Sequence, residues 1–190
     1  MTTLLDHAII IAVQAHAGQF RKDKRTPYIV HPVAVVRILA GNLDVTDEEV
    51  LAAGALHDTV EDTHITAAYL EEQFGKRVTE LVSWVTNPED LLHRSGQFMQ
   101  AKQAHILKII REAPMDAVRI KLADRMDNVR DASGPIPSGV WSIEKRQQFF
   151  AQSVEIFRAI RDRALQEKAG LIEQVAAAEA AVTAMACGWR

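Results

Sequence analysis

Apolar residues recur at helical spacing along almost the whole chain, and no stretch shows the sustained alternation of a half-buried strand. A loop follows Gly18, and the Asn-Pro pair at 87–88 ends another periodic segment. The spacing predicts a helix that Thr46 or Asp47 caps and that ends near His57. It also predicts helices over 4–13, 32–41, 66–74, 77–85, 101–111, 115–131, 143–167 and 171–186. The pattern therefore favours an all-α fold.

The chain of 190 residues is long enough to bury a core without disulfides, and no internal repeat or domain boundary is visible. We expect a single domain over 1–190, with a core at about 3–165 and a C-terminal helix at about 171–186. The segment 89–100 is polar, and we expect it to be partly mobile. A loop is predicted at 134–139, where Gly and Pro cluster.

Charge and cysteine usage exclude some classes of function. A formal net charge of −3 argues against a nucleic-acid binder. The single cysteine, Cys187, cannot form an intramolecular disulfide and favours a reducing compartment. The apolar run 8–13 is too short to span a membrane and lacks the preceding basic residues of a secretory signal. We therefore expect a cytoplasmic protein without a membrane partner.

The run Leu-His-Asp-Thr-Val-Glu-Asp-Thr at 56–63 concentrates groups that bind metals or protons. Asp58, Glu61 and Asp62 place three carboxylates within five residues, where they repel one another. A divalent cation removes that repulsion, and His57 beside Asp58 provides a pair of ligands for it. The cluster predicts a metal-dependent hydrolytic site.

Two further candidate ligands lie outside this cluster. Positions three and four apart share one face of a helix, so Asp124 should lie beside Lys121, Asn128 and Asp131. His31 stands at the predicted start of a helix, next to a loop, from which it can point into a cleft. Two imidazoles and two carboxylates suit Mn, Fe, Co or Zn better than Ca or Mg.

Four stretches resemble the HD superfamily of metal-dependent phosphohydrolases, in particular RelA/SpoT-type hydrolases of the alarmone (p)ppGpp. They are RKDKRTPYIVHP at 21–32, LHDTVEDT at 56–63, Phe74-Gly75 with Val85-Thr86, and KLADRMDNVR at 121–130. They occur in the order of the family, and the short chain is similar to the stand-alone small alarmone hydrolases. The resemblance implies a single-domain HD-type helical bundle.

The resemblance also implies roles for particular residues. It implies a Mn²⁺ ion held by His31, His57, Asp58 and Asp124. It implies that Glu61 and Asp62 activate or orient the attacking water, and that Arg21, Lys22 and Asn128 contact a guanine nucleotide. The segment 21–25 has a local net charge of +3, which suits a substrate with several phosphates. The implied reaction removes pyrophosphate from the ribose 3′ position and gives GDP or GTP.

Two other functions remain open at this point. One is the hydrolysis of a different nucleotide on the same scaffold, for example removal of the 2′-phosphate of NADPH. The other is an inactive nucleotide-binding module, which has no need of Glu61. Asp127 departs from the family pattern, in which His or Tyr is usual, and we expect it to affect only the exterior of its helix. The segment 87–105, the preferred metal and the oligomeric state receive no assignment.

Overall fold

The structure is a computed structural model that describes residues 2–88, 98–134 and 142–187. These ranges contain nine helices and no strand beyond an isolated bridge between Phe20 and Pro27. The helices are α1 (Leu4–Ala15), α2 (Val30–Asn42), α3 (Glu48–Leu56), α4 (Thr59–Asp62), α5 (Ala67–Val85), α6 (Phe98–Glu112), α7 (Met115–Ser133), α8 (Ile143–Gln166) and α9 (Ile172–Cys187). The prediction of an all-α fold is confirmed.

Polar side chains cap several helices at their N-terminal ends. Thr3 and Asp6 form a reciprocal capping box at the start of α1. Asp47 caps α3 by accepting a hydrogen bond from the backbone of Glu49, which selects it over Thr46. Thr66 caps α5 in the same way. These caps satisfy backbone N–H groups that have no partner inside the helix.

The boundaries differ from the predicted ones where the chain turns sharply. The predicted helices 66–74 and 77–85 form α5, which Gly75 interrupts with a φ of +81°, a conformation that residues with a Cβ rarely adopt. A short α4 follows His57 and Asp58. Helix α2 begins two residues before Pro32. Segments 89–97 and 135–139, predicted to be polar and loop-forming, lie outside the described residues.

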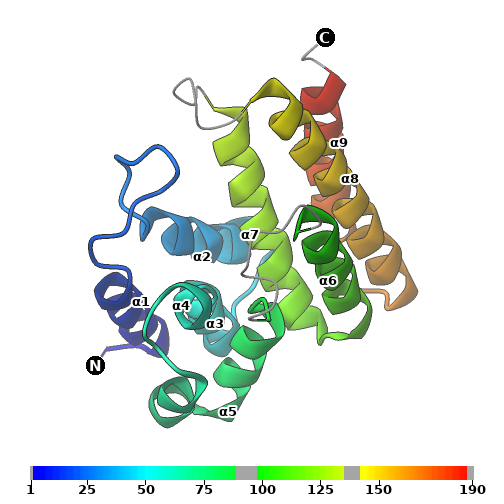
Figure 1. The fold of residues 1–190 in the computed structure, drawn as a ribbon. Coiled ribbons are helices and arrows are strands. Elements are labelled where there is room, and N and C mark those ends of the chain that lie inside the picture. The colour runs from blue at the N-terminus through cyan, green and yellow to red at the C-terminus, as the bar shows by residue number, and fades with distance from the viewer. Residues whose placement is uncertain (1, 89–97, 135–141, 188–190) are drawn as a thin grey trace.

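Helix α7 runs through the middle of the molecule and contacts helices on both sides (Figure 1). It packs against α2, α3 and α5 on one side and against α6, α8 and α9 on the other. Gly54 lets α3 approach α2 closely, because an added Cβ would lie only 2.5 Å from a methyl carbon of Leu39. No described helix combines the length and the apolar character needed to cross a membrane.

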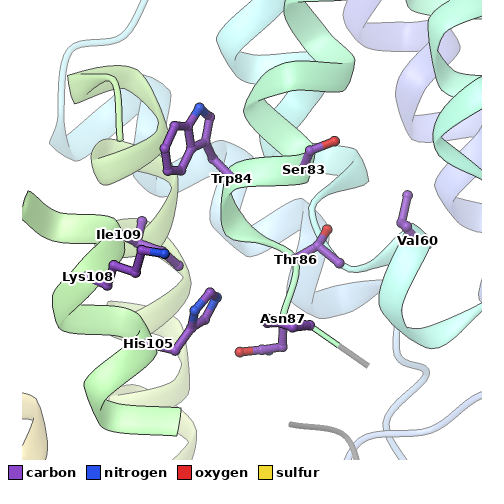
Figure 2. A pocket seen from close by; sticks show the side chains of 9 residues that line it. Val60, Ser83, Trp84, Thr86, Asn87, His105, Lys108 and Ile109 are labelled. Carbon is purple, nitrogen blue, oxygen red and sulfur yellow. The ribbon is translucent and has the colours of Figure 1, made fainter. Parts of the chain in front are cut away.

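A cavity of about 320 Å³ lies between the C-terminal end of α5 and helix α6 (Figure 2). Trp84 and Asn87 line it from the α5 side, and His105 and Lys108 line it from α6. Asn87 is buried and also lines a larger cavity, which contains most of the candidate site residues. It therefore connects the end of α5 to that site.

Candidate metal centre

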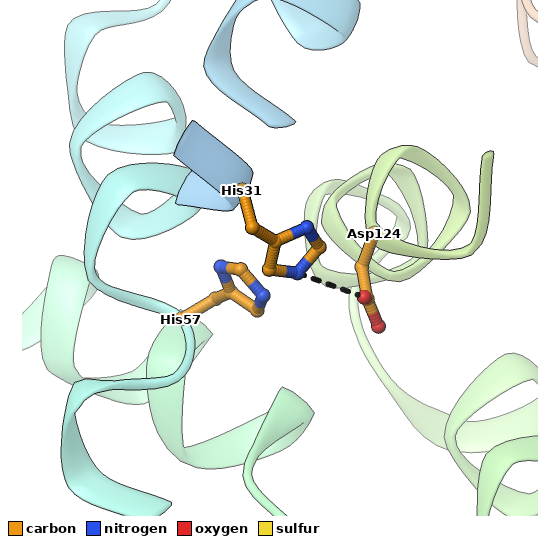
Figure 3. Close-up of side chains that lie close together, drawn as sticks. All are labelled: His31, His57 and Asp124. Atoms are coloured by element: carbon orange, nitrogen blue, oxygen red, sulfur yellow. Dashed lines mark ion pairs between the residues drawn. The ribbon is translucent and has the colours of Figure 1, made fainter. Parts of the chain in front are cut away.

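Three helices bring the side chains of His31, His57 and Asp124 together. His31 lies in the first turn of α2, His57 directly follows α3, and Asp124 lies in the middle of α7. One ligand atom from each residue lies within 4.8 Å of those of the other two. Figure 3 shows the two rings and the carboxylate converging, with His31 Nε2 3.4 Å from Asp124 Oδ1. Ligands on opposite sides of one transition-metal ion lie about 4 Å apart, so little movement would be needed to bind one.

Hydrogen bonds on the far side of each ring set the orientation of the two imidazoles. Nδ1 of His57 donates to the carbonyl of Gly54 over 2.9 Å, and Nδ1 of His31 donates to Asp127 over 2.7 Å. Carbonyl and carboxylate oxygens only accept, so both rings carry a proton on Nδ1 and direct Nε2 toward the centre. Among the described residues, no group donates a hydrogen bond to the buried His57 Nε2. The donor set fits a divalent metal ion.

Asp58, the fourth predicted ligand, also lies at this centre. Its Oδ2 is 3.0 Å from His57 Nε2 and 3.5 Å from His31 Nε2. The Tyr28 hydroxyl donates a hydrogen bond of 2.6 Å to the same oxygen. Burial works against ionisation, but the imidazoles of His57 and His31 outweigh it and hold the pKa of the Asp58 carboxyl well below its usual range.

The remaining charges at the centre depend on one another. Burial opposes the charge of Asp124, but the ammonium of Lys121, 3.1 Å away, and the ring of His31 keep the pKa of Asp124 well below its usual range. Burial also lowers the pKa of His31, but Asp124 and Asp127 outweigh it and raise that pKa to about 9. A protonated His31 therefore balances these carboxylates in the metal-free protein, and a divalent cation would take over that role.

The structure contradicts the expectation for Asp127. This residue does not lie on the exterior of its helix: it is only 6% exposed, and its Oδ2 accepts the hydrogen bond from His31. Helical geometry places it three positions after Asp124, so both residues can reach toward α2. The prediction failed because the packing partner of that face, helix α2, cannot be identified from the spacing within α7 alone.

The acidic pair, Glu61 and Asp62, lies in α4 and lines the main cavity. The backbone N–H and side-chain amide of Asn87 both donate to Glu61 Oε2, over 3.0 and 2.6 Å. Asp62 accepts a hydrogen bond of 3.1 Å from the Tyr28 hydroxyl. Burial and the carboxylates of Asp58 and Glu61 raise the pKa of Asp62. The two acidic side chains are thus held by different partners.

The main cavity has a volume of about 530 Å³, within the range that accommodates a small-molecule ligand. The predicted substrate-binding residues Arg21, Lys22 and Asn128 line it together with His31, Asp58, Glu61, Asp62 and Asp124. Arg21 donates hydrogen bonds to Asp131 and Asn128, and these two contacts fix the orientation of its guanidinium group. Although Lys22 is exposed, burial of its amino group in the cavity wall and the nearby cations Arg21 and Lys102 lower its pKa to about 8.

Some residues of the site received no role from the sequence. Tyr28 lies inside the matching stretch 21–32, but its motif alone does not show that it contacts two carboxylates. Asn87 was interpreted only as part of a helix-breaking pair. Arg125 lines the cavity, stacks on Phe149 with its guanidinium carbon 4.1 Å from the ring centroid, and donates to Ser153. The position of Arg125 directly after Asp124 was the available signal for it.

Comparisons with known proteins identify the family of the chain. A family model described as an HD domain matches residues 8–164. A zebrafish protein named guanosine-3′,5′-bis(diphosphate) 3′-pyrophosphohydrolase MESH1 is 35% identical over 170 residues, which cover 88% of this chain and 91% of that protein. The human protein of the same name is 37% identical over 159 residues, covering 82% of this chain and 85% of the relative.

A solved structure shows the same arrangement of helices. It is described as a metazoan ortholog of SpoT that hydrolyses ppGpp and plays a role in starvation responses. It superposes with a TM-score of 0.75 at 31% sequence identity and covers 94% of both chains. The family model spans the helices that carry His31, His57 and Asp124, and the chain belongs to the HD-domain family of phosphohydrolases.

Proposed function

We propose that this protein is a Mn²⁺-dependent (p)ppGpp 3′-pyrophosphohydrolase. The observation that carries the proposal is the convergence of His31, His57 and Asp124. Two of them, His31 and Asp124, line a cavity that Arg21 and Lys22 also line. Mixed imidazole and carboxylate ligands suit Mn²⁺, and cationic walls suit a substrate with several phosphates. The names of the zebrafish and human relatives specify the same reaction for those proteins.

We infer the following division of labour among the residues. His31, His57, Asp58 and Asp124 hold the metal ion. When bound there, a divalent ion would lower the pKa of a water molecule and polarise the phosphoryl oxygen under attack. Glu61 would accept a proton from the attacking water, and Asp62 would orient that water. The oxygen of the water forms a bond to the phosphorus that is attached to the ribose 3′ oxygen, and the bond between that phosphorus and the 3′ oxygen breaks. The proton accepted by Glu61 passes to the 3′ oxygen, so pyrophosphate and GDP or GTP are released.

Substrate binding follows from the cations in the cavity. Arg21 is held by Asp131 and Asn128, so little side-chain entropy is lost when it contacts the nucleotide. Its guanidinium can pair with phosphate or stack on a purine. Lys22 lies next to it in the sequence and adds a second positive charge to the cavity lining. We propose that Asn128 positions two residues of the site. Its side-chain oxygen accepts a hydrogen bond from Arg21, and its amide nitrogen donates to Asp124.

We also propose that residues 1–190 fold as a single domain. Helix α9, which lies beyond the residues matched by the family model, packs along α8 and contacts α7. Arg158 of α8 donates to Glu179 of α9 over 2.8 Å, and Glu179 is buried. These contacts support the assignment of α9 to the same core.

The proposal predicts that the protein with Mn²⁺ releases pyrophosphate from ppGpp. The assay measures pyrophosphate and GDP by chromatography, with NADPH as the competing substrate and a chelator-treated sample as the control. We expect a kcat/KM at least about 100-fold higher for ppGpp than for NADPH, because the two diphosphates of ppGpp can pair with the cations that line the cavity. Phosphate release from NADPH without pyrophosphate release from ppGpp would establish the alternative substrate instead.

The lowered pKa of Lys22 predicts how substrate binding depends on pH. Lys22 is ionised below its pKa of about 8 and becomes neutral above it, so its attraction for phosphate is lost as pH rises. We expect the KM for ppGpp to increase roughly tenfold between pH 7 and pH 9, the value of one charge-assisted hydrogen bond. Lys22→Arg stays ionised over this range and should show a nearly flat KM. Equal slopes in both proteins would exclude this role for Lys22.

A further inference from the structure

Asp127 contacts both the candidate metal centre and the candidate substrate-binding arginine. Its Oδ2 lies 2.7 Å from His31 Nδ1 and 3.7 Å from Arg21 Nη2. The side chain comes from α7, whereas His31 comes from α2, 96 positions away in the sequence. Only 8% of the Asp127 side chain is exposed, so water competes little for its carboxylate.

The two imidazoles of the centre are held by different kinds of acceptor. His57 donates to the Gly54 carbonyl, which belongs to the backbone of its own helical segment. That contact is local and depends on no other side chain. His31 donates to a carboxylate on another helix, which is a stronger acceptor than a carbonyl. The orientation and electron donation of His31 therefore depend on one side chain, that of Asp127.

We propose that Asp127 is a positioning residue that holds His31 with its proton on Nδ1 and its Nε2 lone pair directed at the metal. The proposal rests on the metal site of the proposed function. A carboxylate behind a ligating imidazole fixes the ring and makes it a better donor, and losing such a partner typically weakens metal binding 10- to 100-fold. The contact with Arg21 places the same carboxylate next to the substrate side of the cavity.

The test measures the dissociation constant for Mn²⁺ directly, from the electron paramagnetic resonance signal of the free ion. We expect Asp127→Ala to raise this constant about 10- to 100-fold. Asp127→Asn keeps an oxygen that can accept from Nδ1 and should recover most of the affinity. Circular dichroism and the unfolding midpoint in metal-free buffer check the fold. If Asp127→Ala does not fold, Asp127→Ser, whose side chain is one bond shorter, replaces it.

Asp116→Asn is the matched control, because Asp116 lies in the first turn of the same helix, α7, and pairs with Arg77 and Arg119 rather than with His31. We expect it to bind Mn²⁺ as the parent does. Parental affinity in a folded Asp127→Ala protein would overturn the positioning role. Equal weakening in the Asp127→Ala, Asp127→Asn and Asp116→Asn proteins would also overturn it, since only general loss of negative charge would remain. A parent that binds no Mn²⁺ would overturn the metal site itself.

Discussion

Replacing Glu61 with glutamine is expected to lower kcat for ppGpp by about 100- to 10,000-fold, the usual contribution of a general base. Glutamine has nearly the same shape and can still accept the hydrogen bonds that Asn87 donates to Glu61. It cannot take a proton. Both contacts from Asn87 use Oε2, so they leave Oε1 to act on water. Binding of ppGpp should change by only a small factor, because the substituted group is not one of the cations that hold the phosphates.

The measurement combines single-turnover kinetics with an equilibrium binding assay for ppGpp. Glu80→Gln is a matched control, since Glu80 lies exposed on α5 and pairs only with Lys76 among the described residues. Turnover at the parental rate in Glu61→Gln would show that Glu61 has no catalytic role. Unchanged binding with lost turnover separates an enzyme from an inactive nucleotide-binding module. Asp62→Asn should lose less activity, and a larger loss there would exchange the roles of the two acids.

The fold was largely predictable because its signal is local. Apolar residues at helical spacing identify the positions of the long helices, and the pair Thr46 and Asp47 marks the start of α3, where the structure selects Asp47 as the cap. The interruption at Gly75 was predicted as well, but as the end of one helix before a second one, at 77–85. The structure joins the two segments in α5, and Gly75 adopts a positive φ between them. The short α4 was not predicted. Its four residues, Thr59–Asp62, are too few to show a period.

The candidate site also has a part that local sequence predicts and a part that depends on how the helices pack. His57 and Asp58 are adjacent in the sequence and form a recognisable motif, so a short stretch of sequence is enough to predict them as metal ligands. Nothing local shows that Asp124 lies beside His31, a contact created by the packing of α2 on α7. The resemblance to known hydrolases supplied that pairing. It could not supply Asp127, because this chain departs from the family pattern at that position.

The side chains that hydrogen-bond to the candidate site residues could not be predicted from the sequence. Tyr28 reaches Asp58 and Asp62, and Asn87 reaches Glu61 across 26 positions of sequence. Each contact joins residues from separate elements, and its geometry depends on how those elements pack. A motif contains the residue types that a reaction requires. The side chains that orient those residues depend on how the surrounding helices pack. Such partners are therefore visible only once the helices are placed.

Replacing Asp124 with asparagine is expected to weaken Mn²⁺ binding by more than about 100-fold, beyond the usual effect of losing a partner behind a ligand. Activity on ppGpp should fall to background. Asparagine keeps the volume of the side chain and an oxygen that can accept from Lys121, 3.1 Å from the carboxylate. The fold should therefore survive. Asp116→Asn, on the first turn of the same helix, is the control and should bind Mn²⁺ normally.

Asp124→Ala should differ from Asp124→Asn in stability, although both lose the metal. Alanine suits a helix, but it leaves the ammonium of Lys121 buried, with only 8% of that side chain exposed. Breaking a buried pair by removing one partner typically costs about 3–5 kcal/mol. Urea denaturation in metal-free buffer should thus show a lower free energy of unfolding for the alanine variant than for the asparagine variant. Two results would contradict the proposed chemistry: parental activity in Asp124→Asn, or activity of the parent after removal of all divalent metal. In either case hydrolysis would proceed without the cation that Asp124 helps to hold.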